Sequence, residues 1–428
     1  MEIVSFCCER GDSMKEKKGI AGLFLAGVLL ANGTAVSAAE VKNLEVNRMP
    51  SGDMAEYTPS KPMELLSGQD AAELDAIMQA YNAGGSSLNK NASGSYYYYE
   101  NLDPVAKEIY DVMLGVAQDP VSEGNIGLMM TDIDPTGQDY YYEFNVAYRA
   151  LCFDHPELFW LYAGQEAEMV YLSEAVNYGG FYFVYIKMAE PFTNYETQMN
   201  AFNAAAASFL ADINQDASDY EIVRQIHDKL IDLVNYNDPV GDGEVEWDRG
   251  QDLAHTAYGC LVADSSGNPN YAVCDGYTLA MEYLLQQCGI EAAFIGGMAG
   301  SSQADAGGHA WNIVKIENVW YEVDATWDDA GSQEDDLTPG TEEYQYFMEA
   351  LNDPEYREKL DHFLFLVSTD TITHFVPGDE YKYITSDGMY EIQMVQESVH
   401  IRLNNSEWGS DCDSAIIALA PNAMQSYR

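Results

Sequence analysis

The sequence predicts an α+β protein in which an amphipathic helix packs against an antiparallel sheet. Two observations predict this arrangement. An apolar-periodic run begins at Cys274 and ends before Gly289, a residue that can terminate a helix. Two alternating stretches, 309–316 and 319–326, are separated by only two residues, which favours an antiparallel hairpin.

Composition places the chain among ordinary globular proteins. Its 428 residues predict two or three compact units, and 47% are hydrophobic while 21% are charged. The 20 Lys and Arg against 70 Asp and Glu give a formal net charge of −50. That charge disfavours contact with nucleic acid phosphates and anionic membranes, so we expect no nucleic-acid partner. An excess of acid is more simply explained by solubility outside the cell.

The N-terminus predicts export. Three lysines between positions 15 and 18 precede an apolar run at 20–31, and small residues at 37–39 follow, as in a secretory signal peptide over 1–39. The run is too short for a helix that crosses a bilayer roughly 30 Å thick, so we expect no stable membrane insertion after cleavage. Met14 is an alternative start. Five cysteines remain after cleavage, an odd number, so at least one thiol is free.

The remaining chain divides by composition and periodicity. We predict a flexible lead-in at 40–99, an N-terminal α+β region at 100–215, a catalytic domain at 216–385 and a C-terminal β segment at 386–428. In the N-terminal region, 181–188 alternates like a strand, and the aromatic cluster at 154–160 is expected to be core. Acidic stretches at 238–250 and 332–343 are predicted surface loops. Alternation at 390–395 and 399–403 suggests a terminal hairpin.

Cys274 lies at the start of its predicted helix. A helix N-terminus carries partial positive charge, so a thiol there ionises more readily than a free cysteine with its pKa of about 8.5. The N–H groups of the first turn can also stabilise an oxyanion. Cys274 is therefore the candidate nucleophile. Cys288 lies fourteen residues further on, roughly 21 Å along the same helix, and cannot bridge it.

His309 and Asp324 are the candidate base and its orienting carboxylate. If Glu317 and Asn318 form a two-residue turn, Ile316 pairs with Val319 and Val314 with Tyr321; the same register pairs Trp311 with Asp324 and His309 with Thr326. His309 and Asp324 then share one face as diagonal neighbours, with Cα atoms roughly 7–8 Å apart. A one-residue change in loop length would place them on opposite faces.

A zinc site is one alternative to a catalytic cysteine. His255, Cys260, Cys274 and His309 are all zinc-ligand types, but the sequence has no Cys-x-x-Cys and no closely spaced histidine pair. We therefore expect no metal and no cofactor. His227 and His255 are expected to be structural, and the tryptophans at 311, 320 and 327 to line the core or a cleft.

Several motifs resemble one family. Cys274-Asp-Gly-Tyr, His309-Ala-Trp-Asn and the segment 320–329 closely resemble the bacterial transglutaminase-like superfamily, and the segments 226–237 and 154–160 also resemble segments of its secreted members. The resemblance is specific over about 220–376. It implies a papain-like α+β core, a thiolate nucleophile at Cys274, a general base at His309 and an orienting carboxylate at Asp324, in a secreted bacterial protein.

The resemblance leaves the reaction open, because the family includes amidases, peptidases, crosslinking enzymes and inactive members. Cys274 would form an acyl-enzyme with a peptide or protein substrate, such as a cell-wall peptide, and water or an amine would release it. Hydrolysis is slightly favoured, since no sequence feature would build an amine-acceptor site. Tyr258 is a candidate second oxyanion donor, or simply a packed tyrosine. The rival hypothesis is a non-catalytic surface or adhesion protein that retains the triad.

Overall fold

The computed structural model describes sixteen stretches of the chain: 47–48, 96–118, 126–131, 138–162, 170–171, 176–178, 181–187, 195–236, 252–262, 270–300, 306–329, 339–373, 381–384, 391–394, 399–403 and 412–427. The predicted signal peptide and the acidic loop at 238–250 lie outside the described residues. So do most of the predicted lead-in and most of the stretch at 332–343.

The described residues form two compact units. One contains the described residues up to Tyr195 together with 412–416, and the other contains those from Glu196 to 403 together with 417–427. Each unit has its own sheet and helices. The candidate catalytic residues all belong to the second unit.

The first unit is a mixed helix and sheet region. Its strands pair antiparallel in the order β1-β3-β5-β2, with β4 also on β5. Its elements are β1 (Asn47–Arg48), α3 (Tyr97–Asn101), α4 (Pro104–Gln118), β2 (Ile126–Thr131), α5 (Gln138–Asp154), α6 (Phe159–Tyr162), β3 (Val170–Tyr171), β4 (Val176–Tyr178), β5 (Phe181–Lys187) and most of α15 (Cys412–Ile417).

Asp154 organises the helices of this unit. Its buried carboxylate accepts hydrogen bonds from the backbone N–H groups of Tyr98 and Tyr99, at 3.0 and 2.8 Å, and from the Tyr110 hydroxyl at 3.1 Å. The first two satisfy N–H groups at the start of α3 that have no partner within the helix. The aromatic residues that follow Asp154, such as Trp160, are buried, so the prediction that this cluster is core is confirmed.

The second unit contains a four-stranded antiparallel sheet in the order β10-β9-β8-β13. Its elements are α7 (Tyr195–Leu210), α8 (Asp219–Leu233), β6 (Val234–Tyr236), η2 (Asp252–His255), α10 (Ala257–Leu261), β7 (Asn270–Ala272), α11 (Cys274–Gln287), β8 (Ala292–Gly300), β9 (Gly307–Ile316), β10 (Val319–Val323), α12 (Glu342–Leu351), α13 (Pro354–Leu360), α14 (Thr369–Thr373), β11 (Tyr381–Ile384), β12 (Glu391–Met394) and β13 (Val399–Arg402).

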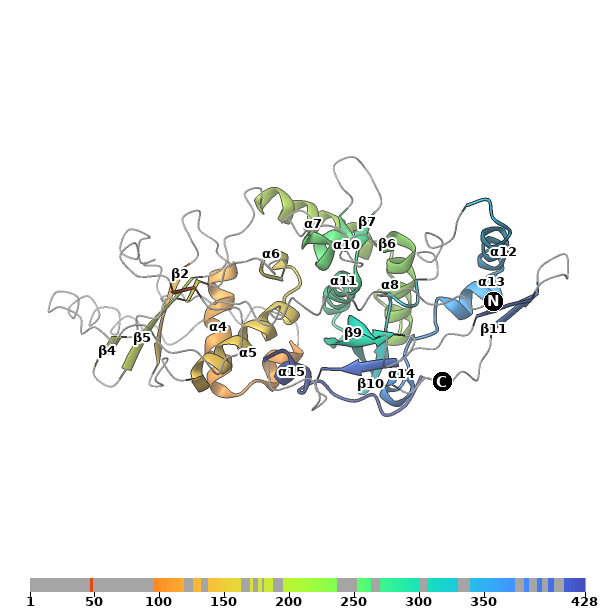
Figure 1. Ribbon diagram of the computed structural model, residues 1–428. Coiled ribbons are helices and arrows are strands. Elements are labelled where there is room, and N and C mark those ends of the chain that lie inside the picture. Colours follow the sequence, from red (N-terminus) through yellow and green to blue (C-terminus); the bar gives the residue numbers. More distant parts are fainter. Residues whose placement is uncertain are drawn as a thin grey trace. The chain divides into compact units, whose positions relative to one another are not determined.

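Helix α11 packs on β8 and β9, and α8 packs on α11, so the helices cover the sheet as Figure 1 shows. The predicted α+β core, with the cysteine-bearing helix on an antiparallel sheet, is confirmed. Ser218 and Glu221 form a capping box that starts α8. The apolar residues at spacings of three and four along α8, including Ile226 and Leu230, are buried as their periodicity predicts.

The hairpin between β9 and β10 has the predicted turn. Glu317 and Asn318 both have positive φ, 50° and 67°, as a two-residue type I′ turn requires. Ile316 pairs with Val319 and Val314 with Tyr321, as predicted. The ladder ends where Asn312 pairs with Val323, because the chain turns away at 325–328; the predicted pairs beyond that point do not form.

The predicted terminal hairpin is wrong. Strand β12 pairs with β11, and β13 pairs with β8 at the edge of the main sheet. Alternation identified both segments as strands but could not identify their partners, since any open sheet edge offers unpaired N–H and C=O groups. The consequence is that β13 delivers His400 to the sheet that holds His309.

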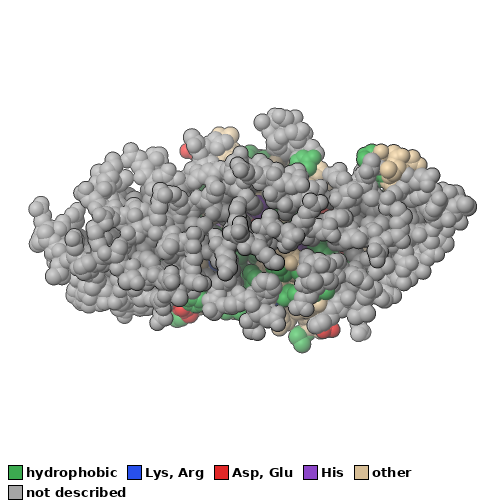
Figure 2. Space-filling view, viewed as in Figure 1, with side chains coloured by type: hydrophobic (Ala, Val, Ile, Leu, Met, Phe, Trp, Pro, Cys, Tyr) green, Lys and Arg blue, Asp and Glu red, His purple; other side chains and the backbone are tan. Residues whose placement is uncertain are grey.

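Acidic side chains of described residues reach the surface at separate points on the face drawn in Figure 2. None of the described helices is long and apolar enough to span a membrane.

Candidate active site

Cys274 is the first residue of α11 and is partly exposed. The preceding residue, Val273, supplies no side-chain cap, and its own N–H donates to the Ala254 carbonyl at 3.0 Å. Within the first turn, the Asp275 carboxylate accepts the Gly276 N–H at 3.1 Å, so an acidic side chain lies next to the candidate nucleophile.

Gly276 explains part of the Cys-Asp-Gly motif. A Cβ at this position would lie 2.4 Å from the Ala254 carbonyl oxygen and 2.9 Å from the Ala272 Cβ, so only glycine lets α11 start this close to η2. Asp275 also finds a partner in η2, because His255 Nδ1 lies 2.8 Å from its Oδ2. His255 therefore contacts the carboxylate next to the candidate nucleophile.

His309 and Asp324 are brought together as the sequence predicted. His309 Nε2 lies 2.7 Å from Asp324 Oδ2, and both side chains are buried. Asp324 Oδ1 accepts the N–H groups of Thr326 and Trp327 at 3.0 and 3.2 Å. Burial alone would raise the pKa of Asp324, but the two histidines it contacts outweigh burial and hold that pKa well below its usual range.

The second of those histidines is His400, which the sequence analysis missed. Its Nε2 lies 2.8 Å from Asp324 Oδ2, the same oxygen that His309 contacts, and its side chain is fully buried. Burial lowers the pKa of His400, which makes it a neutral N–H donor to the carboxylate. Its Nδ1 has no hydrogen-bond partner among the described residues. The sequence feature that could have identified His400 is its position within the alternating stretch 399–403.

The sheet register puts His309 and His400 on one face. On β8, Gly297 pairs with His309, and Ala299 pairs with His400. Since residues two apart on a strand share a face, both histidines lie on the face that carries Gly297 and Ala299. These small residues leave room between the two rings. A Cβ on Gly297 would lie 2.7 Å from the Trp311 ring.

Tryptophans enclose the histidines. Trp311 stacks beside His309 with ring centroids 6.0 Å apart, and Trp327 meets His400 edge-on at 5.0 Å. Trp311 Nε1 donates to Glu322 Oε2 at 2.9 Å, and Glu322 also pairs with Arg402 of β13. Both tryptophans are buried, as expected for core or cleft-wall residues. This enclosure limits the motion of both imidazoles.

Hydrogen bonds fix the cysteine-bearing helix on the histidine-bearing strand. Asn312, on β9, donates from Nδ2 to the Thr278 carbonyl at 3.0 Å, and the Thr278 hydroxyl donates to the Cys274 carbonyl at 2.8 Å. The Tyr277 hydroxyl donates to Asp329 at 2.8 Å, which ties α11 to the segment after Asp324. Hydrogen bonds thus join the helix that carries Cys274 to the strand that carries His309 and to the segment that follows Asp324.

The other cysteines of the second unit are in less reactive surroundings. Cys260 is fully buried, and burial raises the pKa of its thiol well above the usual value. Burial also raises the pKa of Cys288. Tyr258, on α10, is partly buried and its pKa is raised by that burial; its role as an oxyanion donor stays a prediction.

Two groups of described residues could hold a metal ion by the proximity of their ligand atoms. One is His309, Asp324 and His400, and the other is His227, Asp228 and His362. The four zinc-type residues considered from the sequence do not make up either group. Burial opposes protonation of His227, but Asp228 and Asp328 outweigh it and raise the pKa of His227 to about 9.

Part of the second unit is similar to a known family. Residues 207–325 match the model of the transglutaminase-like superfamily. A solved structure described as a crystal structure of a TGase is 14% identical, with a TM-score of 0.24. The match covers 36% of this chain and 43% of that chain, so this chain matches less than half the length of that protein. No curated protein matches.

Proposed function

Because residues 207–325 form a transglutaminase-like superfamily domain, we propose that this protein is a thiol enzyme that acts on amide bonds through an acyl-enzyme on Cys274. The observation that carries the proposal is the buried contact of 2.7 Å between His309 Nε2 and Asp324 Oδ2. A buried carboxylate on one ring nitrogen fixes the orientation of the imidazole and leaves Nδ1 to exchange a proton with the thiol.

The first half of the reaction forms a thioester. The Cys274 thiol gives its proton to His309 Nδ1, and the thiolate attacks the amide carbonyl carbon. Backbone N–H groups at the start of α11 stabilise the resulting oxyanion. The C–N bond then breaks, and His309 returns the proton to the leaving amine. Asp324, ionised at neutral pH, stabilises the imidazolium in between.

The second half decides the reaction type. Water that loses a proton to His309 attacks the thioester, the C–S bond breaks, and the products are a carboxylic acid and the free thiol. An amine in place of water gives a new amide and hence a crosslink. We favour hydrolysis slightly, because release by water needs no second binding site for an amine.

The proposed substrate is a peptide or protein, with a cell-wall peptide as one candidate, and the proposed location is outside the cell. The signal-peptide pattern at 1–39 supports export. A non-catalytic surface or adhesion protein remains the alternative, and it predicts an unreactive thiol. Reactivity of Cys274 therefore separates the two functions.

The test is intact-mass labelling of the mature protein with limiting iodoacetamide at neutral pH. We expect fast labelling at one site, which Cys274→Ala removes and His309→Ala slows by at least about tenfold, since the thiolate is the reactive species. Cys288→Ala is the matched control and should label like the parent. Slow labelling that neither active-site substitution changes would refute an assembled thiol site.

A reactive thiol then allows the reaction type to be measured. Peptide mixtures are incubated with and without an added primary amine, and the products are identified by mass. A gain of water marks hydrolysis, whereas incorporation of the amine marks transfer.

A further inference from the structure

An aspartate lies directly after the candidate nucleophile. Asp275 is the second residue of α11 and the acidic residue of its first turn, and its Oδ1 accepts the Gly276 N–H at 3.1 Å. A negative charge beside a thiol disfavours the thiolate, and the same carboxylate is a competing acceptor for the thiol proton. Transfer of that proton to His309 therefore requires that Asp275 be held in place and its charge offset.

His255 on η2 makes a contact that can do both. Its Nδ1 lies 2.9 Å from Asp275 Oδ1 and 2.8 Å from Oδ2, so one ring nitrogen faces both oxygens. Because a carboxylate only accepts hydrogen bonds, Nδ1 carries a proton and donates. The side chains of His255 and Asp275 are 17% and 14% exposed. Water screens such a pair less than an exposed one, so the contact reduces the effective charge of the carboxylate.

The backbone on both sides of His255 is fixed against α11. The Ala254 carbonyl accepts the Val273 N–H at 3.0 Å, immediately before the candidate nucleophile. A Cβ on Gly276 would lie 2.4 Å from the Ala254 oxygen and 3.2 Å from the Thr256 oxygen. Thr256 in turn caps the start of α10 through its side chain. These main-chain contacts place the imidazole beside the first turn of α11.

The basic side chains on other elements that pack against α11 have acidic partners elsewhere. Lys315 on β9 pairs with Glu291 at 2.7 Å, and on α8 the same is true of Arg224, His227 and Lys229. The remaining described titratable groups on elements that contact α11 are the acidic residues and tyrosine of α8 together with Tyr258, Cys260, Tyr271 and His309. Of this last set, His309 is the residue that can carry positive charge, and it is the proposed base. His255 is thus the basic side chain placed to offset Asp275.

We propose that His255 is a positioning residue for the candidate nucleophile, which holds the Asp275 carboxylate and offsets its negative charge so that the Cys274 thiol passes its proton to His309. His255 was expected from the sequence to be structural. In the proposed role it forms no bond with the substrate. This role rests on the proposed function, because it requires a thiolate at Cys274.

The test measures how fast limiting iodoacetamide alkylates Cys274 in the full mature chain as a function of pH. Peptide mass identifies the labelled cysteine, and circular dichroism monitors the fold. His255→Leu removes the donor, whereas His255→Asn keeps an N–H at the position of Nδ1. Asp275→Asn removes the charge on which His255 acts, and combining it with His255→Leu completes a double-mutant cycle.

We expect His255→Leu to move the pH midpoint of alkylation upward by about 0.5–1 unit, which slows alkylation about three- to tenfold on the acid side of the midpoint. His255→Asn should lie close to the parent. Asp275→Asn should move the midpoint downward, and adding His255→Leu to it should cause no further shift. Loss of packing alone would change the free energy of unfolding and not the midpoint, so the pH profile separates the proposed role from a structural one.

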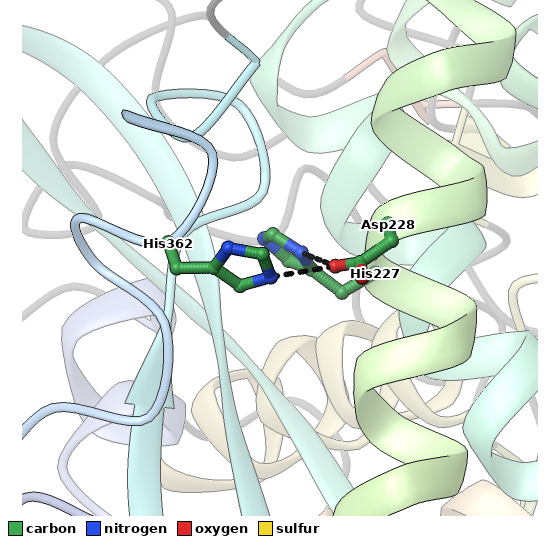
Figure 3. Close-up of side chains that lie close together, drawn as sticks. All are labelled: His227, Asp228 and His362. Atoms are coloured by element: carbon green, nitrogen blue, oxygen red, sulfur yellow. Dashed lines mark hydrogen bonds and ion pairs between the residues drawn. The ribbon is translucent and has the colours of Figure 1, made fainter. Parts of the chain in front are cut away.

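His362→Leu is the matched control. Figure 3 shows His362 directed at the Asp228 carboxylate; its Nε2 lies 2.8 Å from Asp228 Oδ1, and its side chain is 16% exposed. This pair resembles the His255 pair in its contact and in the exposure of the histidine, but it joins α8 to the segment after α13. Substitution of His362 should therefore leave the midpoint unchanged.

Two results would overturn the role of His255 and leave the proposed function standing. One is a parent-like profile for His255→Leu in a protein whose Cys274 reacts fast and needs His309. The other is a shift of equal size in the Asp275→Asn background, because His255 would then act other than through that carboxylate. Slow labelling of the parent that His309→Ala does not change would instead refute the proposed function, and the role of His255 with it.

Discussion

Replacing His400 with leucine removes one of the two imidazole donors to the buried Asp324 carboxylate while keeping similar side-chain volume. Asp324 Oδ2 keeps its contact with His309 at 2.7 Å and loses the one at 2.8 Å. The two histidines hold the pKa of Asp324 low against the effect of burial, so removing one of them must raise that pKa. Glutamine at position 400 is the matched control, since its amide can still donate.

The magnitude follows from the value of a hydrogen bond to a charged group, roughly 1.5–3 kcal/mol. At about 1.4 kcal/mol per pKa unit, His400→Leu should raise the pKa of Asp324 by roughly 1–2 units. A carboxyl group whose pKa is lower in the folded protein than in the unfolded chain stabilises the fold at pH values above its unfolded pKa of about 3.9. This contribution is lost as the pH falls toward the folded pKa. The loss begins near that unfolded pKa in both proteins, and in the leucine variant it is complete at a pH roughly 1–2 units higher than in the parent.

The assay combines two measurements on the parent and both variants. Urea unfolding at neutral pH should show His400→Leu less stable by about 1.5–3 kcal/mol, with the difference shrinking in acid as Asp324 protonates. The acid limb of the Cys274 alkylation rate against pH should move upward with it, and His400→Gln should lie between the two. A leucine variant with the parent's stability and the parent's acid limb would refute a role for His400 in holding Asp324.

Three further predictions use the same measurements. Gly276→Ala should cost about 1–3 kcal/mol and slow Cys274 alkylation because its Cβ meets backbone, whereas Gly308→Ala, which meets nothing within 4 Å, should leave the free energy of unfolding unchanged. Glu322→Leu should lower the free energy of unfolding by about 3–5 kcal/mol, because it strands the buried Arg402 charge; an equal loss in Glu322→Gln would show that charge is not the cause. The raised His227 pKa of about 9 predicts a contribution to stability that is fully present below about pH 6.5 and lost as the pH rises through 9, measurable by urea unfolding; a flat profile would contradict it.

Local patterns predicted the hairpin and its register. Alternation set the two strands, and a two-residue connection between them left only turns with positive φ, which Glu317 and Asn318 adopt. The side-chain period of two then placed His309 and Asp324 close enough to hydrogen-bond. The pairs beyond Asn312 failed because Asp324 accepts N–H groups two and three residues ahead, and this stabilises a turn where a strand was predicted.

The contacts between distant residues could not be predicted from the sequence. His400 joins Asp324 from 76 positions away, through the pairing of β13 with β8. The pattern at 399–403 predicted a strand but placed it in a separate hairpin. Likewise, His227 and Asp228 could be read as neighbours on a helix, whereas His362 reaches them from 134 positions beyond Asp228.

The sequence by itself therefore determined the helix that carries the thiol, the thiol's place at its start, the two-residue turn of the hairpin, and the shared face of the histidine and the aspartate. Each of these depends on interactions within a few residues or across a two-residue loop, which the order of side chains specifies directly. The tertiary structure alone decided which distant histidines complete the two carboxylate clusters. Those partners depend on which surfaces are buried and which sheet edges are open, and many segments with the same alternating pattern could pair with one open edge.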